Sequence, residues 1–291
     1  MKIRVSHIGS IALGLLTHAQ AASVIGVTSR GVFLHLASGW VIYLSNEAQR
    51  GPLTLNCTRK GDLLKPITHG EKAEISPGKI IFPTIGMVID ARQAIPWHAP
   101  ALPNALLPPG ERLAKLRLVA GLVHARQTAS LLAGLLPIIT GFAQQTSAPV
   151  HALTPQIVGL QGALAKRQRT GIVSSLADFF GLGSGLTPSG DDLVMGFLLA
   201  MRRWGHVLAP DLMVEELTRH LLPLAYQKTT TLSANLIECA ALGQADERLL
   251  LALDGIMTTN PDPPTCAAAL AAWGNTSGHD ALVGMALCIT V

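Results

Sequence analysis

Two short stretches of the chain place serine, glycine and aspartate in the same order. "SGDDLVMG" at 189–196 and "SGHDALVG" at 277–284 share the pattern S-G-x-D-x-x-x-G, and each has a threonine just upstream. Because such a match is improbable in two unrelated places, we interpret the stretches as two copies of one local structural motif. An apolar run follows each copy, which predicts that both lie at the start of a helix.

Helix capping explains part of this pattern. Ser189 and Ser277 are expected to be N-caps, and Asp192 and Asp280 then fall at the third helical position, where a carboxylate completes a capping box. Asp191 is surplus to capping. It could bind a divalent metal, orient a hydrogen-bond donor or accept a hydrogen bond from a substrate amide.

The turn before the first helix, here called the glycine turn, holds Gly181, Gly183, Gly185 and Gly190. Its open backbone amides are of the kind that binds anions. In the second copy His279 takes the place of Asp191, and an imidazole could donate to a carboxylate or phosphate. We expect the two helix starts to converge on one polar pocket. Gly196 and Gly284, four residues after the aspartates, would let another helix or a ligand approach closely.

A third polar stretch, "TTTLSANLIECAALG" at 229–243, places Thr230 and Ser233 at helical spacing. The stretch could be an N-cap followed by an ordinary core helix. Alternatively, its hydroxyls could lie beside the glycine turns. The predicted catalytic residues are Asp191, Asp192, His279 and Asp280. The predicted substrate-binding residues are Gly183, Gly185, Thr187, Ser189, Gly190, Ser277, Gly278, Thr230 and Ser233.

Composition excludes several classes of protein. The net charge is only +4 and aromatic residues make up 4%, so the basic run "KRQR" at 166–169 does not predict a nucleic-acid site. No apolar run reaches the roughly 20 residues of a membrane span. Four scattered cysteines form no CxxC pair, which argues against zinc and favours a reducing cytoplasm. No motif indicates a nucleotide or organic cofactor, which leaves a divalent metal at Asp191 and Asp192 as the one cofactor to consider.

The elements that must position these residues predict an α+β fold. Residues 23–95 have β-like runs, 96–110 hold five prolines, and helices are expected at 111–136, 155–169, 172–180, 189–204, 211–226, 230–242, 245–258, 263–273 and 277–289. We therefore expect a β-rich domain over 1–110 and an all-helical domain over 111–291. Apolar residues from Ile8 to Ala19 recur at helical spacing, which predicts a leading helix, although the same segment loosely fits a signal peptide.

The motifs "GLGSGLTPSGDD", "TTTLSANLIECAALG" and "GNTSGHDALVG", in this order, resemble the bacterial family that includes the AllH subunit of oxamate carbamoyltransferase. The N-terminal stretch also resembles the opening of that family, which argues against a signal peptide. The resemblance implies functional motif positions at Gly183, Gly185, Thr187, Pro188, Ser189, Asp191, Asp192, Ser277, Gly278 and Asp280.

The resemblance further implies a subunit that works with an FdrA-like protein and a further carbamoyltransferase subunit in allantoin and purine catabolism. The complex would convert oxalurate and phosphate, both small anions, to oxamate and carbamoyl phosphate. Two other functions stay open at this point. One is a non-catalytic assembly or ligand-sensing subunit, and the other is a stand-alone enzyme that acts on another small amide or acyl acid.

Overall fold

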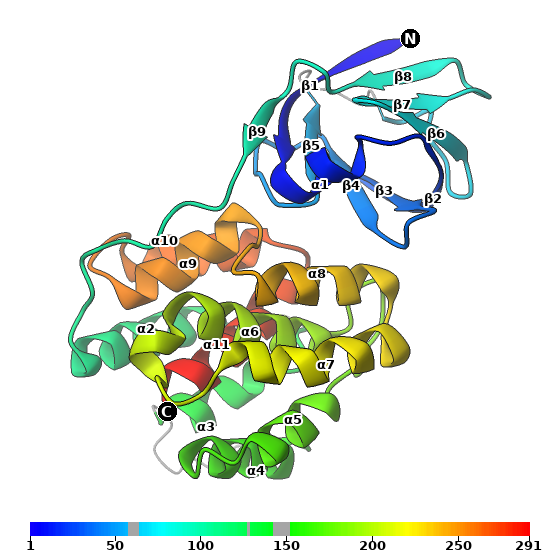
Figure 1. Cartoon of the computed structure of the whole chain (residues 1–291). Helices are drawn as coiled ribbons and strands as arrows, with labels where there is room; N and C mark the ends of the chain where they lie inside the picture. Colours follow the sequence, from blue (N-terminus) through cyan, green and yellow to red (C-terminus); the bar gives the residue numbers. More distant parts are fainter. Residues whose placement is uncertain (58–63, 127–128, 142–151) are drawn as a thin grey trace. The chain divides into compact units, whose positions relative to one another are not determined.

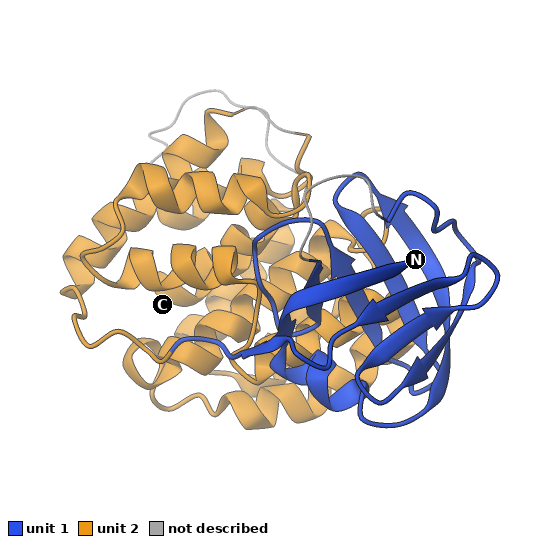
Figure 2. Ribbon diagram, turned by 90° about the horizontal axis from the view of Figure 1, so that it is seen from above, with its two compact units in different colours: residues 1–100 blue, residues 101–291 orange. Residues whose placement is uncertain are grey.

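The computed structural model of the chain describes residues 1–57, 64–126, 129–141 and 152–291. Figure 1 follows the chain from its β-rich N-terminal part to its helical C-terminal part, which confirms the predicted α+β class. Contacts between Cα atoms divide the chain into two compact units, residues 1–100 and residues 101–291 (Figure 2). The predicted site residues all fall in the second unit.

Unit 1 is a closed sheet of mixed parallel and antiparallel strands. Its strands are β1 (Lys2–Gly9), β2 (Gln20–Thr28), β3 (Gly31–Leu36), β4 (Val41–Ser45), β5 (Thr54–Cys57), β6 (Lys72–Ser76), β7 (Lys79–Phe82), β8 (Met87–Asp90) and β9 (Ile95–Trp97). Within the described residues the strand order is β5-β4-β3-β2-β6-β7-β8-β1-β9, and the additional pairing of β5 with β1 closes eight of the strands into a barrel. Alternating buried residues of these strands, such as Leu34, Leu44 and Ile80, fill its core.

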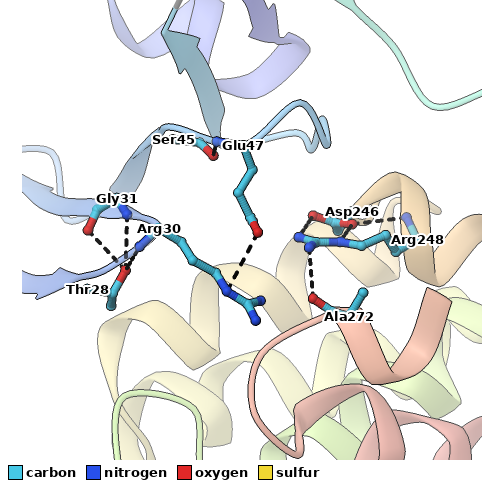
Figure 3. A network of polar contacts seen from close by, with 8 residues as sticks. All are labelled: Thr28, Arg30, Gly31, Ser45, Glu47, Asp246, Arg248 and Ala272. Carbon is cyan, nitrogen blue, oxygen red and sulfur yellow. Dashed lines mark hydrogen bonds and ion pairs between the residues drawn. The ribbon is translucent and has the colours of Figure 1, made fainter. Parts of the chain in front are cut away.

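The β2–β3 turn of unit 1 shows how a short polar side chain closes a hairpin. The Thr28 hydroxyl donates to the Gly31 carbonyl at 3.1 Å and accepts from the Arg30 and Gly31 amides at 3.2 and 3.1 Å (Figure 3). Threonine suits this position because its hydroxyl can satisfy backbone groups that the tight turn leaves unpaired.

The predicted leading helix is wrong in its extent. Residues Lys2–Gly9 form β1, and the helix α1 covers only Ser10–Leu15. β1 pairs with β5, β8 and β9, so strand pairing with distant parts of the chain overrides the helical spacing that begins at Ile8.

Unit 2 is helical, as expected. Its helices are α2 (Pro109–His124), the short 3-10 helix η1 (Ala133–Leu135), α3 (Leu136–Thr140), α4 (Thr154–Ala165), α5 (Arg169–Ala177), α6 (Ser189–Leu208), α7 (Val214–Lys228), α8 (Thr231–Ala241), α9 (Glu247–Met257), α10 (Pro263–Ala272) and α11 (Ser277–Ile289). Among the described residues, no helix combines the length and the apolar composition that a membrane span requires.

The single long helix predicted over 111–136 is also wrong, because α2 ends at His124 and the next helical segment among the described residues begins at Ala133. The segment between them provides polar groups to α11: the Ser130 hydroxyl and the Leu132 amide both donate to Asp280. These long-range hydrogen bonds take the place of the helical ones that the apolar spacing suggested.

Helices α6 and α11 are buried along most of their length and lie in the interior of unit 2 (Figure 1). They touch backbone to backbone at two glycines. A Cβ atom on Gly196 would lie 2.1 Å from the carbonyl oxygen of Ala281, and one on Gly284 would lie 1.9 Å from that of Leu193. Since Leu193 and Ala281 directly follow Asp192 and Asp280, this crossing also sets how close the two aspartates are.

We predict that Gly284→Ala lowers the free energy of unfolding by roughly 1–3 kcal/mol, because the backbone of α6 must move to accept a methyl group. The matched control is Gly159→Ala in the middle of α4, where an added Cβ would meet nothing within 4 Å. It should raise the free energy of unfolding by about 0.5–1 kcal/mol. Urea unfolding of both variants measures the difference. Equal effects of the two substitutions would show that the close crossing does not exist.

Candidate functional site

The two motifs begin their helices one residue earlier than the sequence predicts. The N-caps are Pro188 and Thr276, so Ser189 and Ser277 are the first helical residues and neither N-cap side chain makes a capping hydrogen bond. The predicted capping boxes are therefore wrong. Pro188 has the extended backbone of an N-cap, and its carbonyl accepts from the amides of Asp191 and Asp192 at 3.0 and 3.2 Å. The serine hydroxyls remain available for another role.

That role is to bind the aspartate of the other motif. The Ser277 hydroxyl is close enough to Asp192 to lower the pKa of that carboxyl group, and the Ser189 hydroxyl has the same effect on Asp280. Thr187 joins the arrangement, since its Oγ1 atom lies 3.2 Å from Oγ of Ser277. The expected convergence of the two helix starts is confirmed, and the contacts are crossed between the motifs.

Asp192 and Asp280 each keep one acceptor atom unused. Oδ1 of Asp280 accepts from the Ser130 hydroxyl at 2.6 Å and from the Leu132 amide at 3.1 Å. The Oδ2 atoms of Asp192 and Asp280 are buried, and among the described residues neither accepts a hydrogen bond of normal geometry. A buried carboxylate oxygen without a donor is costly, so two of them in one place call for a ligand or a proton.

Burial dominates the electrostatics of this cluster. It raises the pKa of Asp192 well above its ordinary value of 3.8, and the charges of Asp280 and Asp191 raise it further, against the effect of Ser277. Burial also raises the pKa values of Asp191 and Asp280, although hydroxyl and amide donors oppose the rise at both. Three carboxyl groups with raised pKa values favour protons, amide N–H groups or cations.

Asp191 is satisfied within the protein. Its Oδ1 accepts from the Gly181 amide at 2.8 Å, and its Oδ2 accepts from the Thr229 hydroxyl. One amide of the glycine turn therefore binds an aspartate, and Asp191 joins that turn to the start of α8.

Both interpretations of the threonine stretch hold. Thr230 is the N-cap of α8 and accepts from the Ser233 amide at 3.1 Å. The Thr230 hydroxyl also donates to the carbonyl of Leu186 in the glycine turn at 2.6 Å, and the Ser233 hydroxyl lies 3.4 Å from the same oxygen. The start of α8 is thus fixed against the turn that precedes α6.

The glycines of the first motif fall into two groups. Gly181, Gly183 and Gly185 are exposed and have φ angles of +74°, +120° and +91°, which side chains other than glycine rarely adopt. Gly190 and Gly278 are buried against carbonyl oxygens of Phe179 and Leu270, where a Cβ would lie 2.0 and 1.9 Å away. These last two glycines allow close packing of the helix starts.

His279 lies in α11 and is buried to 1% exposure. Burial lowers its pKa, and the charge of Arg126 lowers it further, so the imidazole is neutral near pH 7. Within the described part of the chain, no group of three or more His, Cys, Asp or Glu side chains is arranged to hold a metal ion.

The sequence analysis missed three groups that hold the aspartates: the Thr229 hydroxyl, the Ser130 hydroxyl and the Leu132 amide. Thr229 could have been chosen, because it begins the same threonine run as Thr230. Ser130 and Leu132 have no local pattern that marks them.

Arg248 of α9 fixes the end of α10, just before the second motif. Its Nε and Nη2 atoms donate to Asp246 at 2.8 Å each, and its Nη1 donates to the Ala272 carbonyl at 2.9 Å (Figure 3). This bidentate pair positions the turn that leads into α11.

We predict that Asp192→Asn changes how stability depends on pH. A carboxyl group whose pKa is raised by folding favours the fold at low pH, and this contribution is lost as the pH rises from 3.8 through the raised pKa. The amide cannot ionise, so the free energy of unfolding of the variant relative to the wild type should increase across that window by about 1.4 kcal/mol per pH unit. Urea unfolding between pH 4 and 8 measures it, with the exposed Asp178→Asn as control. A difference that stays constant with pH would contradict the burial of a titrating Asp192.

Comparison with known proteins bears on the part of the chain that carries this site. No curated protein and no solved structure matches the chain. Residues 179–289 match the model of the family described as "Oxamate carbamoyltransferase subunit AllH". The matched segment begins just after α5, ends with α11 and includes the glycine turn, α8 and both S-G-x-D helix starts. The match confirms, for the segment that carries both motifs, the resemblance to the AllH family that the sequence indicated.

Proposed function

We propose that this chain is a cytoplasmic subunit of an oxamate carbamoyltransferase-type complex, which converts oxalurate and phosphate to oxamate and carbamoyl phosphate. The family match over 179–289 supports the assignment. The observation that carries it is the pair of buried, unused Oδ2 atoms on Asp192 and Asp280 at the crossed helix starts. An FdrA-like protein and a further carbamoyltransferase subunit would be its partners.

The two unused oxygens suit a carbamoyl group. The terminal NH₂ of oxalurate presents two N–H donors, and two acceptors held by opposite helices can receive one each. Because the carboxylates are removed from water, such hydrogen bonds are stronger than at an exposed site. The crossed serines and the backbone contact at Gly196 and Gly284 hold the acceptors in place before a ligand arrives.

The glycine turn would bind the anionic part of a substrate, whereas the carboxylates would bind its N–H groups. The Gly181 amide donates to Asp191, but the amides of Gly183 and Gly185 donate to no other described group and lie in an exposed segment. Backbone amides in such a turn favour oxygens of a phosphate or carboxylate. Thr187, Ser189 and Ser277, whose hydroxyls are at the two helix starts, are half-buried.

Carbamoyl transfer requires both kinds of group. A phosphate oxygen attacks the carbamoyl carbon, an oxyanion forms, and the bond from that carbon to the nitrogen of the oxamate part breaks. Amide donors stabilise the oxyanion. The leaving nitrogen must gain a proton, and a carboxyl group whose pKa is raised by burial, as that of Asp192 is, can carry one.

Reconstitution tests the proposal. The chain is purified alone and with the products of its neighbouring genes, and carbamoyl phosphate formed from oxalurate and phosphate is measured. We predict activity only when this chain is present, and loss of turnover by at least about a hundredfold in Asp192→Asn, the size of effect typical for a lost acid–base group. Asp178→Asn, an exposed aspartate near the same motif, is the control and should keep wild-type turnover.

Two results would contradict parts of the proposal separately. Wild-type turnover by a folded Asp192→Asn complex would remove Asp192 from the mechanism. No turnover of oxalurate by folded and associated subunits would make the substrate assignment wrong, and an assembly or ligand-sensing role would then be favoured.

A further inference from the structure

Helix α2 begins its buried face with two cations. The buried residues of α2 are Arg112, Lys115, Leu116, Val119, Ala120 and Val123, which follow the helical repeat. The last four are apolar, as expected for a helix that packs on its neighbours. Arginine and lysine are rarely buried unless they are paired, so the first two positions need an explanation.

Lys115 is explained by contacts within unit 2. Its Nζ donates to the carbonyls of Thr258 and Thr259 at 2.7 and 2.8 Å, at the end of α9. Burial lowers the pKa of Lys115, and the charge of Asp262 opposes this effect. Lys115 therefore has both hydrogen-bond acceptors and a counter-charge.

Arg112 has neither. The residue is 7% exposed, and its Nε and Nη1 atoms are buried without a hydrogen-bond partner among the described residues. Burial lowers its pKa, and no carboxylate opposes that effect. A buried guanidinium that lacks partners is strongly unfavourable, so a ligand that supplies acceptors would stabilise this part of the fold.

The segment that leads into α2 is fixed by backbone pairing to the end of α9. The Leu107 amide donates to the Met257 carbonyl at 3.0 Å, and Leu106 forms a β-bridge with Thr258. The segment before α2 is thus paired with the end of α9, next to the residues that hold Lys115. Arg112 lies roughly 18 Å along α2 from the end that leads to Ser130, at a rise of about 1.5 Å per residue. It is therefore separate from the carboxylate cluster.

We propose that Arg112, with Lys115 beside it, forms a binding site for a small oxyanion. The fork of N–H groups on a guanidinium matches two oxygens of a carboxylate or a phosphate, and a buried fork gains the most from that pairing. The neighbouring ammonium adds positive charge one helical turn away. The site does not depend on the proposed carbamoyl transfer, because it lies at the other end of α2 and its test measures the contribution of Arg112 to anion binding.

Thermal unfolding of the full chain, at constant ionic strength set with NaCl, tests the site. Inorganic phosphate and acetate are titrated separately, so that the two sources of oxyanion are distinguished. At saturation the better anion should raise the Tm of the wild type by roughly 5 °C or more. Arg112→Met should lose that rise, and its Tm without anion should equal or exceed that of the wild type. Arg219→Met on α7, which removes an exposed arginine, should keep the full rise.

Arg112→Lys keeps the charge without the fork and covers the case in which Arg112→Met fails to fold. It should bind the better anion at least about tenfold more weakly than the wild type. The proposal is overturned if neither anion raises the Tm of the wild type. It is also overturned if Arg112→Met or Arg112→Lys responds to the anion as the wild type does.

Discussion

The backbone contact between α6 and α11 is the constraint on which the rest of unit 2 depends. Gly196 lies against the Ala281 carbonyl and Gly284 against the Leu193 carbonyl, and only glycine fits at either place. Because each of these carbonyl residues directly follows an aspartate, the same approach that packs the interior densely also brings Asp192 and Asp280 together. Dispersion contacts along two buried helices stabilise the crossing, and the carboxylates oppose it.

The unfavourable burial of the Asp192 and Asp280 carboxyl groups is compensated only in part. The serine of each motif lowers the pKa of the aspartate of the other, and the Ser130 hydroxyl and the Leu132 amide satisfy one oxygen of Asp280. The remaining Oδ2 atoms stay without a donor, and the pKa of each carboxyl group stays raised. A fold that keeps unsatisfied acidic groups in its interior, when alanine or leucine would pack there, keeps them for binding or chemistry.

Local patterns predicted the features that depend on local physics. Apolar spacing and turn residues predicted α6, α8 and α11 to within a few residues, and the repeated S-G-x-D pattern predicted the convergence of the helix starts. The N-cap of α6 was missed by one residue because Pro188 can supply the cap conformation itself. The donors to Asp280 were missed because Ser130 and Leu132 lie about 150 residues away along the chain, where no local pattern indicates the contact. Strand β1 was not predicted for the same reason, since its partners are distant, and the expected leading helix overlapped it only at Ile8 and Gly9.

The two motif copies differ at the residue before the shared aspartate, which is Asp191 in the first copy and His279 in the second. Asp191 in the first copy accepts from the Gly181 amide and the Thr229 hydroxyl, so it is tied to the exposed glycine turn. His279 in the second copy is buried and neutral, next to the charge of Arg126. A small substrate with unlike ends, such as a carbamoyl group at one end and a carboxylate at the other, would meet two equivalent acceptors at Asp192 and Asp280 but different flanks beyond them. The duplication thus explains the two acceptors, and the difference between Asp191 and His279 gives the proposed site an orientation.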